Sequence, residues 1–322
     1  MHKYKKISKN IEEILIDNPI TESKRLSWIN IKNAGKNEIE YLRKKFKFDL
    51  PYLQASSAKA SSQRPIVRSG KGYLFVILHF PVYRNEIIES EEIEFFITRD
   101  HLVTIHNDEL TSLKKFFSLC KKDGEALLSY KLESSAILMY ELLDALISNC
   151  FKLLDDNTIL MREVEGIIFS QNQKIATSKI LYLRRNIINF RRIMQSHKNI
   201  MKKIVELEKS IIPADKLRTY YTTLINRTKR IWEMLENQKE MIEALHDTNE
   251  SMLNYKISDI MKTLTVFSVI VFPLTLFAAI FGMNTIDSMP FVDNENGFWQ
   301  IIILMTIGCF FMLLFFKKKK WL

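Results

Sequence analysis

Two long uncharged apolar segments near the C-terminus restrict most strongly what this chain can fold into. They cover residues 263–281 and 298–316, and each contains 19 residues without a charged side chain. A helix of that length is about 28 Å long and matches a bilayer hydrocarbon core of about 30 Å. A buried hairpin in a soluble core is the alternative, but two uncharged runs of this length are rare in soluble domains. We therefore predict two membrane-spanning helices joined by a short loop.

The charges around this hairpin predict its orientation. The connecting loop contains Asp287, Asp293 and Glu295, and four lysines at 317–320 follow the second segment. Because positive charge stays on the cytoplasmic side, we expect the loop outside and both chain termini in the cytoplasm. Residues 1–9 are basic, but no apolar signal core follows them. The sequence thus predicts a multi-pass protein of the cell membrane, inner or plasma, in contact with lipid.

The region before the hairpin has the pattern of an α+β domain followed by helices. Apolar runs and alternations predict strands at residues 26–31, 73–80, 93–98 and 102–106. The last three should form an antiparallel meander, with Pro81 ending the first of them. Residues 37–47 have helical spacing, and 48–68 should be a loop. Further helices are expected at 110–121, 125–150, 151–170 and 174–209.

Residues 214–262 contain neither proline nor glycine and show a heptad stripe. Its positions are Leu217, Tyr221, Leu224, Thr228, Ile231, Leu235, Gln238, Ile242, Leu245, Asn249 and Met252. Such a helix should pack in an oligomeric bundle or against a parallel neighbour. It continues into the first apolar segment, which gives a rod of about 100 Å.

We therefore expect seven regions. They are an α/β region at 1–125, a helical region at 126–213, a stalk helix at 214–262, a first membrane helix at 263–284, an outer loop at 285–297, a second membrane helix at 298–316 and a basic C-terminus at 317–322.

A second periodicity on the rod is more informative about function. Asp247, Asn254, Met261, Ser268 and Thr275 are each seven residues apart, and other positions near the same face are Ser258 and Leu264. Polar side chains on a membrane helix are costly unless they face a bundle interior or water. The two hydroxyls could instead bond to backbone carbonyls one turn back. The alignment favours a continuous pore lining.

Gly282-Met283-Asn284 ends the first membrane helix, a second helix follows closely, and the chain finishes in KKKKWL. This arrangement resembles the CorA family of divalent-cation channels, and so do residues 259–284 and the strand sequences FVILHFPVY and EIEFFITRDHLVTIH. The resemblance implies a sheet covered by helices in the cytoplasm, a long stalk and a homopentamer around the first membrane helix. The pore positions that it implies are Asp247, Met261, Leu264, Phe272, Thr275 and Asn284.

The resemblance also implies Mg²⁺ uptake, with Co²⁺ or Ni²⁺ as further candidates. Mg²⁺ gives up water reluctantly, so a ring of Asn284 carboxamides with Gly282 carbonyls would hold a hydrated ion. Gly282 should allow the backbone to leave the helix. Met261, Leu264 and Phe272 would form constrictions that gate by dewetting.

Regulation is where the sequence departs from the family. The family commonly senses cytoplasmic Mg²⁺ through acidic residues shared between subunits, but Thr223 and Asn226 stand where aspartates are frequent. Remaining candidates for a regulatory metal site are Asp108, Glu109 and the acids of the run 89–94, with Glu89 first among them. The outer loop has Phe291 in place of a glutamate, and Ser258 stands where an asparagine is frequent.

Other functional classes fit less well. The net charge of +10 includes a basic helix face with Arg184, Arg185, Arg191 and Arg192, but no nucleic-acid-binding motif accompanies it. No nucleophile–base pair can be argued from the sequence, so an enzyme is not expected. Two alternatives stay open, a zinc transporter of the same superfamily and a membrane-anchored scaffold or sensor without transport.

Overall fold

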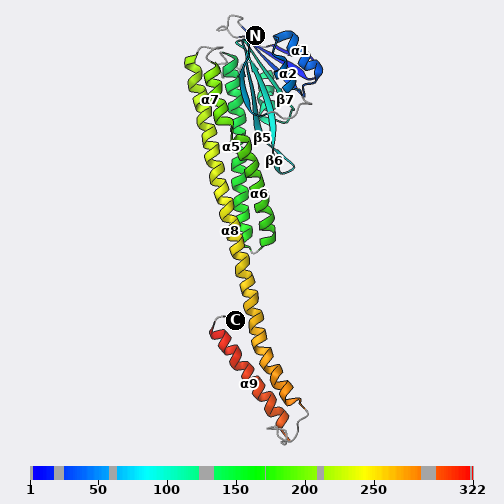
Figure 1. Cartoon of the computed structure of the whole chain (residues 1–322), viewed down its shortest axis with the longest axis vertical. Coiled ribbons are helices and arrows are strands. Elements are labelled where there is room, and N and C mark those ends of the chain that lie inside the picture. Colours follow the sequence, from blue (N-terminus) through cyan, green and yellow to red (C-terminus); the bar gives the residue numbers. More distant parts are fainter. Residues whose placement is uncertain are drawn as a thin grey trace. The chain divides into compact units, whose positions relative to one another are not determined.

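The chain divides into two compact units, Met1–His246 and Asp247–Leu322 (Figure 1). The computed structural model describes residues 3–17, 25–57, 64–122, 134–170, 172–208, 214–283, 295–319 and 321. The boundary between the units falls inside one helix, α8 (Ala214–Phe281), so the same helix contributes to both.

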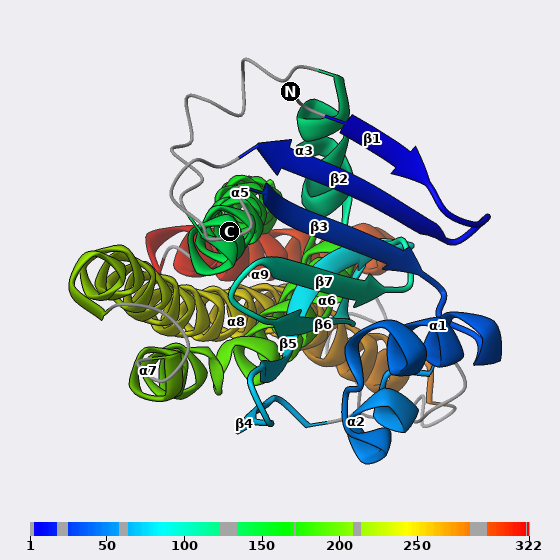
Figure 2. The ribbon, with the colours of Figure 1, turned by 90° about the horizontal axis from the view of Figure 1, so that it is seen from above.

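A seven-stranded mixed sheet forms the centre of the first unit (Figure 2). Its strands are β1 (Lys3–Lys6), β2 (Ile11–Asp17), β3 (Arg25–Lys32), β4 (Ile66–Ser69), β5 (Leu74–Arg84), β6 (Ile87–Ile97) and β7 (His101–His106). Their order is β1-β2-β3-β7-β6-β5-β4, and only the β3–β7 pair is parallel among the described strands. Strands β5, β6 and β7 pair in sequence, which confirms the predicted meander.

Helices cover both faces of this sheet because successive strand residues point to opposite sides. Ile77 of β5 belongs to a core shared with α1 (Lys36–Phe46) and α2 (Leu50–Ala55). Its neighbour Leu78 belongs to the larger core on the other face. The fold is therefore a sheet covered by helices, as the sequence predicted.

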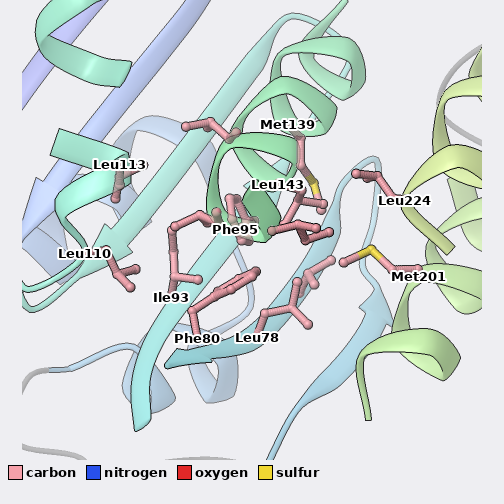
Figure 3. Packing of buried hydrophobic residues seen from close by; sticks show 14 of the residues in the cluster. Leu78, Phe80, Ile93, Phe95, Leu110, Leu113, Met139, Leu143, Met201 and Leu224 are labelled. Atoms are coloured by element: carbon pink, nitrogen blue, oxygen red, sulfur yellow. The ribbon is translucent and has the colours of Figure 1, made fainter. Parts of the chain in front are cut away.

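The larger core joins the sheet to α3 (Thr111–Lys122), α5 (Ser135–Phe169), α6 (Gln173–Met194), α7 (His197–Glu208) and the first part of α8. Figure 3 shows this packing, in which β5 and β6 side chains meet helix residues. The labelled members are Leu78, Phe80, Ile93, Phe95, Leu110, Leu113, Met139, Leu143, Met201 and Leu224.

Two sequence expectations in the N-terminal part were wrong. The predicted loop at 48–68 contains α2 and the start of β4. Pro81 does not end β5, which continues to Arg84 and pairs with β6 throughout. Strand β4 pairs only with residues 74–77 of β5, so Pro81 lies where β5 has become an edge on that side. A proline is tolerated at a strand edge because no neighbour needs its missing N–H.

Two helix boundaries also differ from the expectation. Residues 135–169 form one helix, without the break expected after Cys150, whose side chain is buried at 1% exposure. The helix expected over 174–209 is instead divided at Gln195 and Ser196 into α6 and α7. That turn lets α6 pack on β6 while α7 packs on β4 and β5. The expected segment 125–133 lies outside the described residues.

The second unit contains the end of α8 and helix α9 (Gly297–Lys318). Both helices are long and apolar enough to cross a membrane, with a mean hydropathy of 2.4 for α8 and 2.3 for α9 over their most apolar windows. Almost none of their apolar surface is covered within the chain. The two helices are consistent with the predicted hairpin.

Candidate functional site

One side of α8 is buried against its own chain in the first unit. Tyr221 and Leu235 of the predicted heptad stripe are 0% exposed and belong to the larger core. The Tyr221 hydroxyl donates a hydrogen bond to the Ala136 carbonyl oxygen (3.1 Å), and the Gln238 amide donates to the Leu154 carbonyl oxygen (2.7 Å). Residue numbers increase together along α5 and α8, so the helices are parallel. The prediction of a parallel neighbour is confirmed, and the neighbour is α5 of the same chain.

A different side of α8 stays uncovered in the second unit. Phe272 is 71% exposed and Met261 is 56% exposed. At about 100° per residue, the predicted lining positions fall within about 120° of the helix circumference. The covered residue Val266, 5% exposed, lies on the opposite side. Of the predicted lining residues, Ser268 is half-buried and the exposed ones are Asp247, Asn254, Ser258, Met261, Leu264, Phe272 and Thr275.

Two hydroxyls of the predicted lining, those of Ser268 and Thr275, bond to their own helix. Ser268 Oγ donates to the Leu264 carbonyl oxygen (2.9 Å), and Thr275 Oγ1 donates to the Val271 carbonyl oxygen (2.8 Å). The back-bonding alternative raised from the sequence is therefore present. Each hydroxyl has one hydrogen, and the bond to the helix carbonyl uses it. On the exposed side its oxygen can therefore only accept hydrogen bonds. Such an oxygen can accept hydrogen bonds from the water shell of a cation, so the back-bond and a lining role are compatible.

Helix α8 ends at Phe281, and Gly282 is the first residue after it. Its N–H donates to the Ala278 carbonyl oxygen (3.0 Å), and it does not adopt a positive φ. A Cβ at this position would lie 3.1 Å from the same carbonyl oxygen. Glycine is thus favoured here because a side chain would crowd the Ala278 carbonyl oxygen, and not because the backbone adopts a left-handed turn. Met283 follows with 57% exposure, and Asn284 lies outside the described residues.

The outer loop is represented only by its last part. Glu295 lies just before α9 and is exposed. Asp287, Phe291 and Asp293 lie outside the described residues, so the predicted outer position of this loop stays a prediction.

The acids predicted for a regulatory metal site are paired with cationic side chains. Arg84 contacts Glu89 (2.9 Å) and Glu109 (3.6 Å), so the structure brings these two acids together around a guanidinium. Asp108 contacts Lys114 (3.3 Å) instead. Thr223 and Asn226 are exposed on α8. Among the described residues, no group of three or more His, Cys, Asp or Glu side chains could hold a metal ion.

Two further acids on α8 were missed in the sequence analysis. Glu233 and Glu240 precede Asp247 by two and one heptads, and both are exposed. Glu233 also pairs with Lys229 (3.4 Å). The signal was available, because continuing the seven-residue period toward the N-terminus reaches both positions. The exposed face therefore carries three acids in one line before the apolar segment begins.

The comparisons with known proteins agree with this architecture. Residues 23–318 match the family model described as CorA-like Mg²⁺ transporter protein. A cobalt/magnesium transport protein CorA from Thermotoga maritima is 24% identical over 320 residues, which cover 97% of this chain and 87% of that protein.

Solved structures show the same fold. The complete structure of the CorA magnesium transporter from Methanocaldococcus jannaschii has a TM-score of 0.81 at 20% identity and covers 98% of this chain and 100% of that one. The ZntB cytoplasmic domain from Vibrio parahaemolyticus has a TM-score of 0.52 at 14% identity, covering 71% of this chain and 88% of that one. The predicted combination of sheet domain, long helix and two apolar helices is therefore confirmed.

Proposed function

Because this chain belongs to the CorA-like Mg²⁺ transporter family, we propose that it takes up Mg²⁺ through a pore lined by α8. The observation that carries the proposal is the exposed face between Asp247 and Thr275, which the described chain leaves uncovered. In a symmetric ring, one such face from each copy meets at the axis and encloses a channel. We propose five copies, as the family resemblance implies. The polar groups on this face then line the channel and contact its water, and they do not face lipid.

Gly282, Met283 and Asn284 would form the selectivity filter at the outer end. A ring of Asn284 carboxamide oxygens accepts hydrogen bonds from the waters of a hydrated Mg²⁺ without stripping them. The Gly282 N–H donates a hydrogen bond to the Ala278 carbonyl oxygen (3.0 Å), which connects Gly282 to the end of the helix. The free carbonyls and the negative end of the helix dipole also favour a cation there.

The membrane potential is a sufficient driving force. A divalent cation that enters down 100 mV gains about 4.6 kcal/mol, twice the value of about 2.3 for a single charge. Met261, Leu264 and Phe272 would form the hydrophobic gate, since all three are more than half exposed on the lining face. We place the protein in the cell membrane with both termini in the cytoplasm, because the lysines at 317–320 follow the second helix.

Ion flux into proteoliposomes tests the proposal. The purified chain is reconstituted, an inside-negative potential is imposed, and Mg²⁺ entry is compared with Zn²⁺ entry. Mg²⁺ entry should follow the potential and be lost in Asn284→Ala. Asn199→Ala is a matched control, because it removes the same group from an exposed position on α7. Native mass measurement of the same sample counts the copies.

The other outcomes identify the alternatives. Zinc flux that follows a proton gradient, with little Mg²⁺ entry, would assign the chain to the zinc transporters. The fold similarity to a ZntB cytoplasmic domain keeps this alternative in the test. Absence of flux for both ions from folded oligomers would instead support a scaffold or sensor.

A further inference from the structure

The end of the α5/α6 hairpin in the first unit exposes large apolar side chains. Phe169, the last residue of α5, is 62% exposed, and Ile175 in the first turn of α6 is 47% exposed. Leu181 and Ile188 are more than half exposed further along α6. A single exposed apolar residue needs no explanation, but several along one hairpin indicate a contact surface.

The same hairpin is strongly basic. Residues 166–192 contain no acid and six cations, which are Lys174, Lys179, Arg184, Arg185, Arg191 and Arg192. Lys179 and Arg191 pair with glutamates of α5 and α8. The other four cations are exposed and form no ion pair with a described residue. Lys174 is the one nearest the hairpin end, where α6 has no acid in its first turn and presents the positive end of its dipole.

The hairpin end lies at the end of the first unit from which α8 continues. Helix α5 runs parallel to α8, because Tyr221 bonds to Ala136 and Gln238 bonds to Leu154. The C-terminal end of α5 therefore lies on the side of the unit toward which α8 proceeds to its apolar segment. Since α8 belongs to both units, it tethers the first unit to the bilayer.

We propose that this hairpin end docks on the anionic headgroups of the leaflet that faces the first unit. Phe169 and Ile175 enter the boundary between headgroups and acyl chains, and Lys174 contacts the lipid phosphates. Attraction of a cation to an anionic leaflet falls off within about 8–10 Å. Lys174 lies within that reach when the hairpin end docks, whereas Arg192 is about 27 Å further along α6.

A lipid surface fits this end better than a purely polar partner. The headgroup layer presents negative charge at its surface and apolar chains beneath it, so it matches the cation and the apolar side chains together. A nucleic acid or a soluble anion would neutralise Lys174 but leave Phe169 and Ile175 in water. A second copy of the chain is another surface that could cover them, and a measurement without lipid distinguishes it.

Fluorescence quenching in lipid nanodiscs tests the proposal on the full-length protein. An environment-sensitive fluorophore is attached at Ser170→Cys, an exposed position beside Phe169 that leaves the apolar side chains in place. Cys309 is replaced by alanine, and Cys120 and Cys150 are buried. Lipids that carry a nitroxide on the headgroup should quench this label in phosphatidylglycerol nanodiscs.

Control variants separate the contributions. A label at Ser118→Cys should not be quenched, because Ser118 is exposed on α3 beside the exposed Leu119 and lies outside the hairpin. In the protein labelled on the hairpin, Phe169→Ala should abolish the quenching. Lys174→Ala should lower the ratio of docked to undocked molecules about fivefold, which is about 1 kcal/mol. Lys152→Ala should leave this ratio unchanged, since Lys152 is exposed on α5 about 26 Å before its end.

Three results would overturn the proposal. The first is equal quenching of the labels at 170 and 118. The second is quenching that is the same in phosphatidylcholine nanodiscs and unchanged in Lys174→Ala, since the contact would then not depend on anionic lipid. The third is shielding of the hairpin label from a water-soluble quencher in lipid-free detergent, which would assign the surface to a second copy. None of these results depends on ion flux, so the transport proposal can hold or fail separately.

Discussion

Replacing Leu235 with alanine tests which face of α8 packs within a single chain. Leu235 is 0% exposed in the larger core. Truncating a buried leucine removes its transfer free energy and leaves a cavity, at a cost of about 2–5 kcal/mol. One turn away, Gln238 bonds to the Leu154 carbonyl and limits how far α5 and α8 can close the gap. We therefore expect the free energy of opening α8 to fall by about 3 kcal/mol. Local opening would then be about 150-fold more frequent.

Native-state hydrogen exchange of the full-length protein in detergent measures this opening. Amides of α8 between Tyr221 and Ile242 should exchange about 150-fold faster in Leu235→Ala. Met241→Ala is the matched control on the same helix, since Met241 is 49% exposed, and its effect should stay within about 0.5 kcal/mol. Equal effects of the two variants would refute the reasoning. So would a Leu235→Ala effect that depends on protein concentration, because the stripe would then pack between chains.

Two other predictions concern His106 and Ser268. Burial lowers the pKa of His106 from 6.5 to about 4, so the unfolded state binds more protons between these values and stability falls by about 3 kcal/mol as pH falls from 6.5 to 4. Thermal unfolding from pH 4 to 7 should show a shallower loss in His106→Gln, and an unchanged slope would contradict this cause. Ser268→Ala should lower Mg²⁺ flux without changing stability, whereas Thr306→Ala, which loses the same kind of back-bond (2.8 Å) on α9, should leave flux unchanged.

Local patterns in the sequence predicted most of the elements whose own residues determine them. The alternation at 26–31 predicted β3, and the heptad stripe predicted the parallel packing of α8. The errors arose where tertiary contacts determine the bounds of a helix or strand. Pro81 is compatible with a strand only because β4 is short, and that fact lies in another part of the chain. The break between α6 and α7 depends on which strands each helix covers.

The candidate pore face was predictable to a similar extent. Its period appears in the sequence, but the position of Asn284 does not follow from the described structure. The sequence shows the acidic run at 89–94, but it does not show which of these acids pair with Arg84. The strand geometry decides this, because Arg84 contacts Glu89 and Glu91.

Helix α8 carries two stripes with the same seven-residue period, and their offset explains how one helix can serve two purposes. Leu235 and Ile242 are buried, whereas Glu233 and Glu240 are exposed two residues earlier. An offset of two residues places the stripes about 160° apart around the helix. Packing against α5 therefore uses one side and leaves the opposite side uncovered. The proposed pore face follows the same seven-residue period from Asp247 into the apolar segment of the second unit.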